Sequence, residues 1–69
     1  MLQVLLNGEP QALPEGATVA DAVRAAGAPG QARGVAVALE GEVVPRAEWG
    51  STPLPEGGKV EVLSAVQGG

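Results

Sequence analysis

Short apolar runs bounded by turn residues open the chain and predict a β-hairpin. The first run, 2–6, leads to Asn7-Gly8, the pair that best tolerates the two positive φ angles of a type I′ turn. A second strand is expected over 9–13. Pro10 assigns this strand to the edge of a sheet, because proline cannot donate a hydrogen bond to a neighbouring strand.

The hydrophobic period then changes to that of a helix, with apolar residues spaced i, i+3, i+4, i+7 at Val19, Ala22, Val23 and Ala26. Thr18 can cap this helix, and Asp21, three residues later, resembles the reciprocal half of a capping box. Gly27 supplies the left-handed position after the helix, and Pro29 prevents its continuation. The pattern predicts one helix that begins after Thr18.

Further strands follow the helix. Over 35–39, large and small apolar residues alternate, which predicts a central strand with its bulky side toward a core. The remaining elements are expected to be a short return strand, one helical turn, a loop rich in proline and glycine, and a last strand, over 42–44, 46–49, 51–58 and 59–65. This order predicts an α+β domain, with a mixed sheet of four to five strands packed on one main helix.

Composition narrows the function classes. At 69 residues the chain has room for one small domain, and 12 of its hydrophobic residues are alanine. It contains no Cys and no His, so it lacks a thiol nucleophile, an imidazole base and the usual ligands of zinc or iron. We therefore expect a protein that is not an enzyme and holds no metal.

The charge and the hydropathy pattern bear on partners and location. A formal charge of −4 disfavours nucleic acid, which requires clustered Lys and Arg, and fits a basic protein partner better. No apolar run is as long as a membrane span, and the first residues lack the cationic region of a signal peptide. We expect a cytoplasmic protein that contacts neither nucleic acid nor membrane.

Two leucines are candidates for a partner-binding face. In the last strand, Val60 and Val62 share one face, whereas Glu61 and Leu63 share the other. If the first strand packs the same way beneath the helix, Leu5 and Leu63 lie on the opposite face, which no second helix covers. Exposed leucines of this kind indicate a partner site; the alternative is scattered surface apolar residues, which are normal.

The last four residues carry the candidate chemistry. Val66 and Gln67 lead to Gly68-Gly69, where the sequence ends on a free α-carboxylate. Because glycine has no Cβ, such a tail can thread a narrow channel in another protein. We expect one folded domain over 1–65 and a flexible tail over 66–69, with the Gly69 carboxylate as the reactive group. A frayed, inert end is the alternative.

The order of elements and two motifs carry a resemblance to a known family. Two strands and a helix, with a final strand ending in Gly68-Gly69, resemble the β-grasp of ubiquitin-like proteins. The stretch 44–49, with the letters VPRAEW, resembles the V-P-R-x-x-W segment of the ThiS family, the sulfur carriers of thiamine thiazole synthesis. The resemblance spans essentially the whole chain.

The resemblance implies a function. The Gly69 carboxylate would be adenylated by a ThiF-type enzyme that uses ATP, would be converted to a thiocarboxylate by a persulfide sulfur donor, and would pass its sulfur to a ThiG-type thiazole synthase. The carrier itself would bind no cofactor and would be a monomer when free. Leu63 and Leu5 would lie on the face presented to the activating enzyme, and Gly68, Gln67 and Val66 would thread into it.

Several alternatives remain open at this point. A sulfur carrier for molybdopterin synthesis or tRNA thiolation would share the fold, and a ubiquitin-like modifier would be linked to target lysines through Gly69. A stand-alone β-grasp interaction module would have an inert tail. Trp49 and Arg46 also have a structural interpretation, in which Trp49 is a half-buried anchor of the helical turn and Arg46 is solvated or ion-paired.

Overall fold

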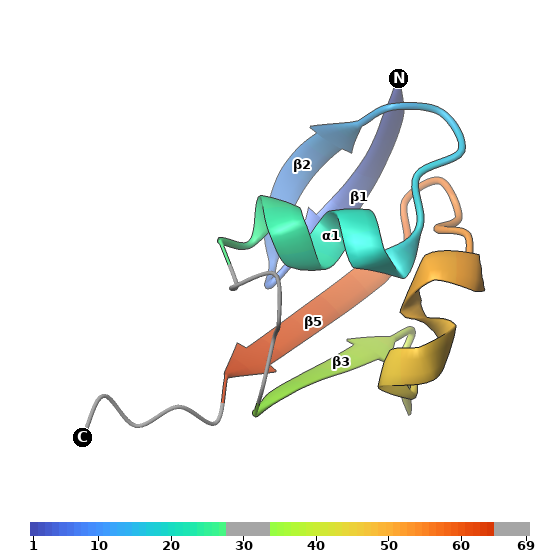
Figure 1. The fold of residues 1–69 in the computed structure, drawn as a ribbon. Helices are drawn as coiled ribbons and strands as arrows, with labels where there is room; N and C mark the ends of the chain where they lie inside the picture. The colour runs from blue at the N-terminus through green and yellow to red at the C-terminus, as the bar shows by residue number, and fades with distance from the viewer. Residues whose placement is uncertain (28–33, 65–69) are drawn as a thin grey trace.

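A computed structural model describes residues 1–27 and 34–64, which form a mixed sheet of five strands covered on one face by a helix (Figure 1). The strands are β1 (Leu2–Leu6), β2 (Glu9–Leu13), β3 (Val35–Leu39), β4 (Glu42–Val43) and β5 (Lys59–Ser64). The helix is α1 (Val19–Ala25), and a 3₁₀ helix, η1 (Arg46–Ser51), follows β4. The expected α+β class is confirmed.

The order across the sheet is β2-β1-β5-β3-β4. β1 runs parallel to β5, and the other neighbouring strands are antiparallel. β3 is paired on both sides, as expected, although β5 holds the middle position. The first strand and the last described strand therefore lie side by side in the sheet.

The opening hairpin forms as predicted. Asn7 and Gly8 have φ angles of 51° and 85°, the two positive values that a type I′ turn requires. β2 lies at the edge of the sheet, where Pro10 pairs with Leu5 without having to donate to an outer strand.

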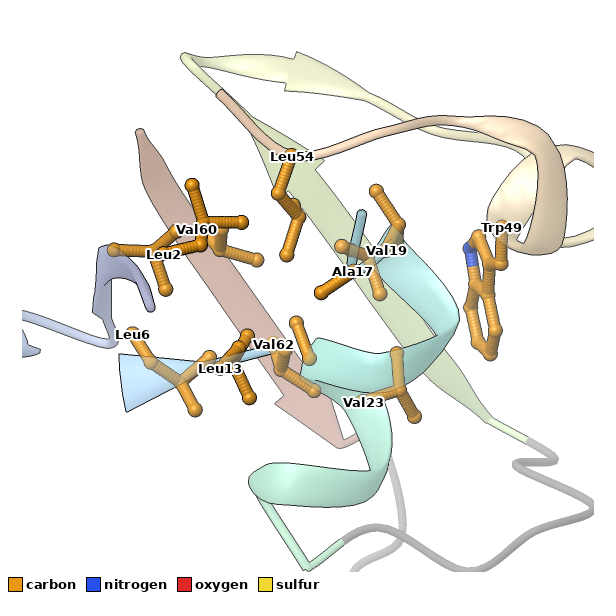
Figure 2. Close-up of a cluster of buried hydrophobic side chains, with 13 residues drawn as sticks. Leu2, Leu6, Leu13, Ala17, Val19, Val23, Trp49, Leu54, Val60 and Val62 are labelled. Atoms are coloured by element: carbon orange, nitrogen blue, oxygen red, sulfur yellow. The ribbon is translucent and has the colours of Figure 1, made fainter. Parts of the chain in front are cut away.

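The core fills the space between α1 and the sheet (Figure 2). It is built from inward-facing strand residues, one side of α1, and single residues from the connecting segments: Leu2, Val4, Leu6, Leu13, Ala17, Val19, Ala22, Val23, Val37, Trp49, Leu54, Val60 and Val62. Ala26 does not join this core, contrary to the helical stripe expected from the sequence. α1 ends at Ala25, so Ala26 is the exposed C-cap residue.

The segment expected to be a loop over 51–58 contributes a core residue that its composition does not reveal. Thr52 accepts a hydrogen bond from the Val19 amide at 2.9 Å, and the Leu54 amide donates to Ala17 at 3.0 Å. A β-bridge between Thr18 and Pro53 lies between these two contacts. The segment is therefore held against the start of α1, which buries Leu54.

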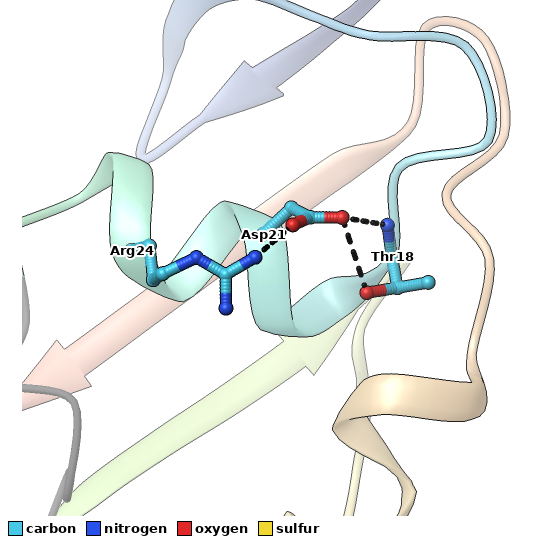
Figure 3. A network of polar contacts seen from close by, with 3 residues as sticks. All are labelled: Thr18, Asp21 and Arg24. Carbon is cyan, nitrogen blue, oxygen red and sulfur yellow. Dashed lines mark hydrogen bonds and ion pairs between the residues drawn. The ribbon is translucent and has the colours of Figure 1, made fainter.

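A short polar network closes the N-terminus of α1 (Figure 3). The Asp21 carboxylate accepts a hydrogen bond from the Thr18 backbone amide at 2.8 Å and one from the Thr18 hydroxyl at 3.3 Å. Arg24 forms an ion pair with the same carboxylate. The Thr18 amide is the main cause of a lowered pKa for Asp21; burial opposes the effect, and the charge of Arg24 adds to it.

Asp21→Asn is expected to lower the free energy of unfolding by about 0.3 to 1 kcal/mol at neutral pH. Because the folded pKa lies below the ordinary value of 3.8, the stabilisation is present above that value. It is lost as the pH falls through the folded pKa. Urea unfolding between neutral pH and acid measures this, with Glu9→Gln on the exposed edge strand as control. The prediction is contradicted if the difference in unfolding free energy between Asp21→Asn and the parent chain does not change with pH.

No helix within the described part of the chain is long and apolar enough to cross a membrane.

Candidate functional site

The candidate site begins where the described structure ends. Gly69, Gly68, Gln67 and Val66, the residues expected to form the reactive tail, lie outside the described residues, as does Ala65 at the expected end of the last strand. The structure shows the strand from which they follow, and β5 is described up to Ser64. The geometry of the site therefore rests on β5 and on the sheet face around it.

β5 occupies the most supported position in the sheet. On one side it pairs with β1 through Leu6 and Val60, and on the other it pairs with β3 up to Val35 and Ser64. Val60 is fully buried beneath α1. A strand in this position is a rigid base for the C-terminal residues that follow it, since its ladder partners and its inward side chains hold it from three directions.

Leu5 and Leu63 both lie on the sheet face opposite α1, as predicted, but they do not form one patch. Leu5 is half-buried and pairs with Lys59, whereas Leu63 is 65% exposed and lies four residues further along β5. At the rise of a β-strand this separates them by about 13 Å. Glu61 shares this face and lies between them along β5.

Leu63 instead has apolar neighbours on the other side, toward β3 and β4. Ala36 pairs directly with it, Ala38 lies next along the same face, and Val43 pairs with Ala38. Val43 is 74% exposed. We call Leu63, Ala36, Ala38 and Val43 the outer-face patch. The alternation over 35–39 predicts that the two alanines of this patch point away from the core. Their contact with Leu63 depends on the register between β3 and β5, which the alternation does not specify.

Comparison with known proteins shows to which family this chain is related. The model of the ThiS family matches residues 4–69, which is nearly the whole chain. The chain belongs to the ThiS family. The resemblance drawn from the sequence is therefore confirmed, and the match reaches Gly68-Gly69 as well as the sheet.

A solved structure supports the same assignment. The chain is similar to the thiamine biosynthesis protein ThiS from Geobacter metallireducens, with 31% sequence identity and a TM-score of 0.76 over 99% of this chain and 100% of that one. This match confirms the ubiquitin-like β-grasp fold. A search of curated protein sequences finds no significant match.

The segment that suggested the ThiS family has a structural role. Trp49 is only 7% exposed, and its indole Nε1 donates a hydrogen bond to the Val44 carbonyl at 3.0 Å. The Arg46 guanidinium carbon lies 5.9 Å from the centre of the Trp49 ring, within the range of a cation–π contact. Trp49 is thus buried rather than half-buried, and η1 extends to Ser51 instead of making one turn.

The side chains around the outer-face patch are apolar or carry single charges. Within ranges 1–27 and 34–64, no three His, Cys, Asp or Glu side chains are grouped so that they could hold a metal ion. The same sheet face carries Lys59 and Glu61, of which Glu61 pairs with Ala38 of the outer-face patch, and Glu40 accepts a hydrogen bond from the Lys59 amide at 2.9 Å. An apolar patch with charged neighbours suits docking to another protein.

Proposed function

We propose that this protein is the sulfur carrier of thiamine thiazole biosynthesis and that it carries the sulfur on the carboxyl carbon of Gly69. Membership of the ThiS family over residues 4–69 carries the proposal, and the similarity to a thiamine biosynthesis protein supports it. The protein acts as a protein co-substrate and not as a catalyst. The residue types present agree with this role, since a carrier needs no thiol and no imidazole of its own.

The chemistry follows from the poor reactivity of a carboxylate. A Gly69 carboxylate oxygen attacks the α-phosphorus of ATP on a ThiF-type enzyme, and pyrophosphate leaves. AMP is now a good leaving group, so a persulfide sulfur can attack the carbonyl carbon and displace it. Reduction of the resulting S–S bond by a thiol leaves a thiocarboxylate on Gly69, whose sulfur is nucleophilic and passes to a ThiG-type thiazole synthase.

The division of the chain follows the same proposal. Residues 1–65 form the β-grasp domain that partners recognise, and residues 66–69 form the tail that enters the active site of the activating enzyme. Gly68, Gln67 and Val66 are the threading residues, and ATP belongs to the partner. The carrier works in the cytoplasm as a monomer when free.

The test is the intact mass of the protein isolated from its native cell. We expect a population heavier by the difference between one sulfur and one oxygen atom, located on the C-terminal residue by fragmentation. The same chain from cells that lack the activating enzyme is the control and should show only the unmodified mass. Unmodified chain in cells with a working sulfur donor and activating enzyme would refute the carrier role, and Gly69 in amide linkage to lysines would indicate a protein modifier instead.

Leu63→Glu is expected to weaken binding to the activating enzyme about tenfold or more, because it replaces an exposed leucine of the outer-face patch with a charged side chain. The stability of the fold should change little, since Leu63 is 65% exposed. Isothermal titration of the variant against the enzyme measures the affinity.

Ala12→Glu is the matched control. It adds the same charge at an exposed position of the outer sheet face, but on the edge strand β2, away from β3 and β4. We expect near-normal affinity for this variant. Equal affinities for Leu63→Glu and the parent chain would remove Leu63 from the contact surface.

A further inference from the structure

β1 ends before β5 does, and the chain leaves the sheet at the Asn7-Gly8 turn. The last paired residues are Leu6 and Val60, and the Asn7 backbone amide donates to the Val60 carbonyl at 2.8 Å. Alternate residues of a strand direct their N–H and C=O groups to the same side. Val62 therefore directs both of its backbone groups toward the place that the next residue of β1 would occupy.

The side chain of Asn7 occupies that place. Its Oδ1 accepts a hydrogen bond from the Val62 amide at 2.8 Å, and its Nδ2 donates to the Val62 carbonyl at 3.3 Å. One carboxamide thus reproduces the acceptor and the donor of a backbone peptide and adds one step to the β1–β5 ladder. Because Val62 is only 9% exposed, the loss of these partners would leave two backbone groups poorly satisfied.

The same residue has to make the turn. Asn7 has a φ angle of 51°, which asparagine and glycine tolerate better than other residues. Glycine could make this turn but has no side chain to reach Val62. Aspartate could accept from the Val62 amide, but it would place an oxygen against the Val62 carbonyl. Asparagine alone among these three satisfies the turn and both hydrogen bonds.

We propose that Asn7 is a positioning residue for adenylation: it holds β5 at Val62, seven residues before Gly69, so that the outer-face patch and the end of β5, from which the chain continues to Gly69, keep one relative geometry. This proposal rests on the proposed function. β3 holds the opposite side of β5 through Ser64, and Asn7 supplies the hydrogen bonds on the β1 side of Val62. Leu63, the next residue, belongs to the outer-face patch.

The consequence lies in binding and not in chemistry. When β5 is held on one side only, its end samples more conformations, and these must be given up when the carrier docks. Such a cost is the same in the bound and transition states, so it raises KM and leaves kcat unchanged. A general loss of stability does not raise KM in this way, as long as the chain remains folded under assay conditions.

The experiment compares two substitutions of Asn7 with a control. Asn7→Gly keeps the turn and removes both hydrogen bonds, whereas Asn7→Asp keeps the acceptor for the Val62 amide. Asp21→Ala is the control, because it weakens the N-terminal cap of α1 by removing the contacts of Asp21 with Thr18 and Arg24 and leaves the contacts of Asn7 with Val62 in place. Amide hydrogen exchange of Val62 and ATP–pyrophosphate exchange with the activating enzyme are measured for each chain.

For Asn7→Gly we expect Val62 to exchange at least about fivefold faster than in Asp21→Ala, and KM for the carrier to rise about two- to tenfold with kcat unchanged. Asn7→Asp should fall between the parent chain and Asn7→Gly, and Asp21→Ala should keep the parent KM. The positioning role is overturned if KM is the same for Asn7→Gly and the parent chain, or if Asp21→Ala raises it equally. A parent chain that the activating enzyme does not adenylate would refute the proposed function, and the positioning role with it.

Discussion

One alanine added after Gly69 is expected to abolish adenylation, with a loss of at least about a thousandfold in kcat/KM. The reacting group is the α-carboxylate, and the extension moves it by one residue and replaces it at Gly69 with a neutral amide. The added Cβ also widens a tail that is narrow because its last two residues are glycines. ATP–pyrophosphate exchange with the activating enzyme measures the effect.

The same alanine placed before Met1 is the matched control. Met1 is 79% exposed, and the ion pair between its ammonium group and Glu15 is also exposed, so it contributes little to stability. This chain should be adenylated normally. Both extended chains should unfold at the parent's urea midpoint, because the core residues lie between Leu2 and Val62. Normal adenylation of the C-terminally extended chain would contradict a reaction at Gly69.

The elements with local signals were predicted correctly. The turn at Asn7-Gly8 depends on two residues that accept positive φ angles, and the start of α1 depends on Thr18 and on a carboxylate three residues later. Each signal lies within a few positions of the element it specifies. The errors in this part lie at the ends of elements: the periodic pattern continues past the last turn of α1 to Ala26, and η1 extends to Ser51.

Contacts between distant segments could not be predicted in the same way. Leu54 lies in a segment without periodicity, and its burial depends on the pairing of that segment with Thr18, far away in the sequence. The separation of Leu5 from Leu63 depends on register between β1 and β5, which the pattern within either strand does not specify. The two hydrogen bonds of Asn7 to Val62 need the same register, so only the turn function of Asn7 was visible.

The candidate site shows the same contrast between local sequence signals and contacts that depend on strand register. The chemistry proposed for it rests on the last residues, because Gly68-Gly69 is read directly from the chain and the ThiS family model extends over it. The sequence indicated the residues of the proposed docking surface only in part. Leu63 was identified as an exposed leucine, whereas Ala36, Ala38 and Val43 join it through pairings of β3 whose register the pattern within each strand does not specify.

Trp49→Ala is expected to lower the free energy of unfolding by about 3 to 5 kcal/mol, the usual cost of removing a large buried aromatic side chain. Trp49 packs in the core, and its Nε1 hydrogen bond to Val44 ties η1 to the end of β4. The total stability of a domain is about 5 to 15 kcal/mol, and a chain of this size lies toward the lower end. A large part of the fold's stability therefore depends on one side chain of the V-P-R-x-x-W segment.

Trp49→Phe separates the two contributions of this side chain. It keeps most of the buried ring and loses the hydrogen bond to Val44, so it should cost about 1 to 2 kcal/mol. Urea unfolding followed by far-UV circular dichroism measures both variants without relying on tryptophan fluorescence. A loss below about 1 kcal/mol for Trp49→Ala would show that η1 is not anchored through Trp49. The expected result places the V-P-R-x-x-W segment among the residues that stabilise the fold, whereas the proposed recognition surface and the proposed chemistry lie on the opposite sheet face and at Gly69.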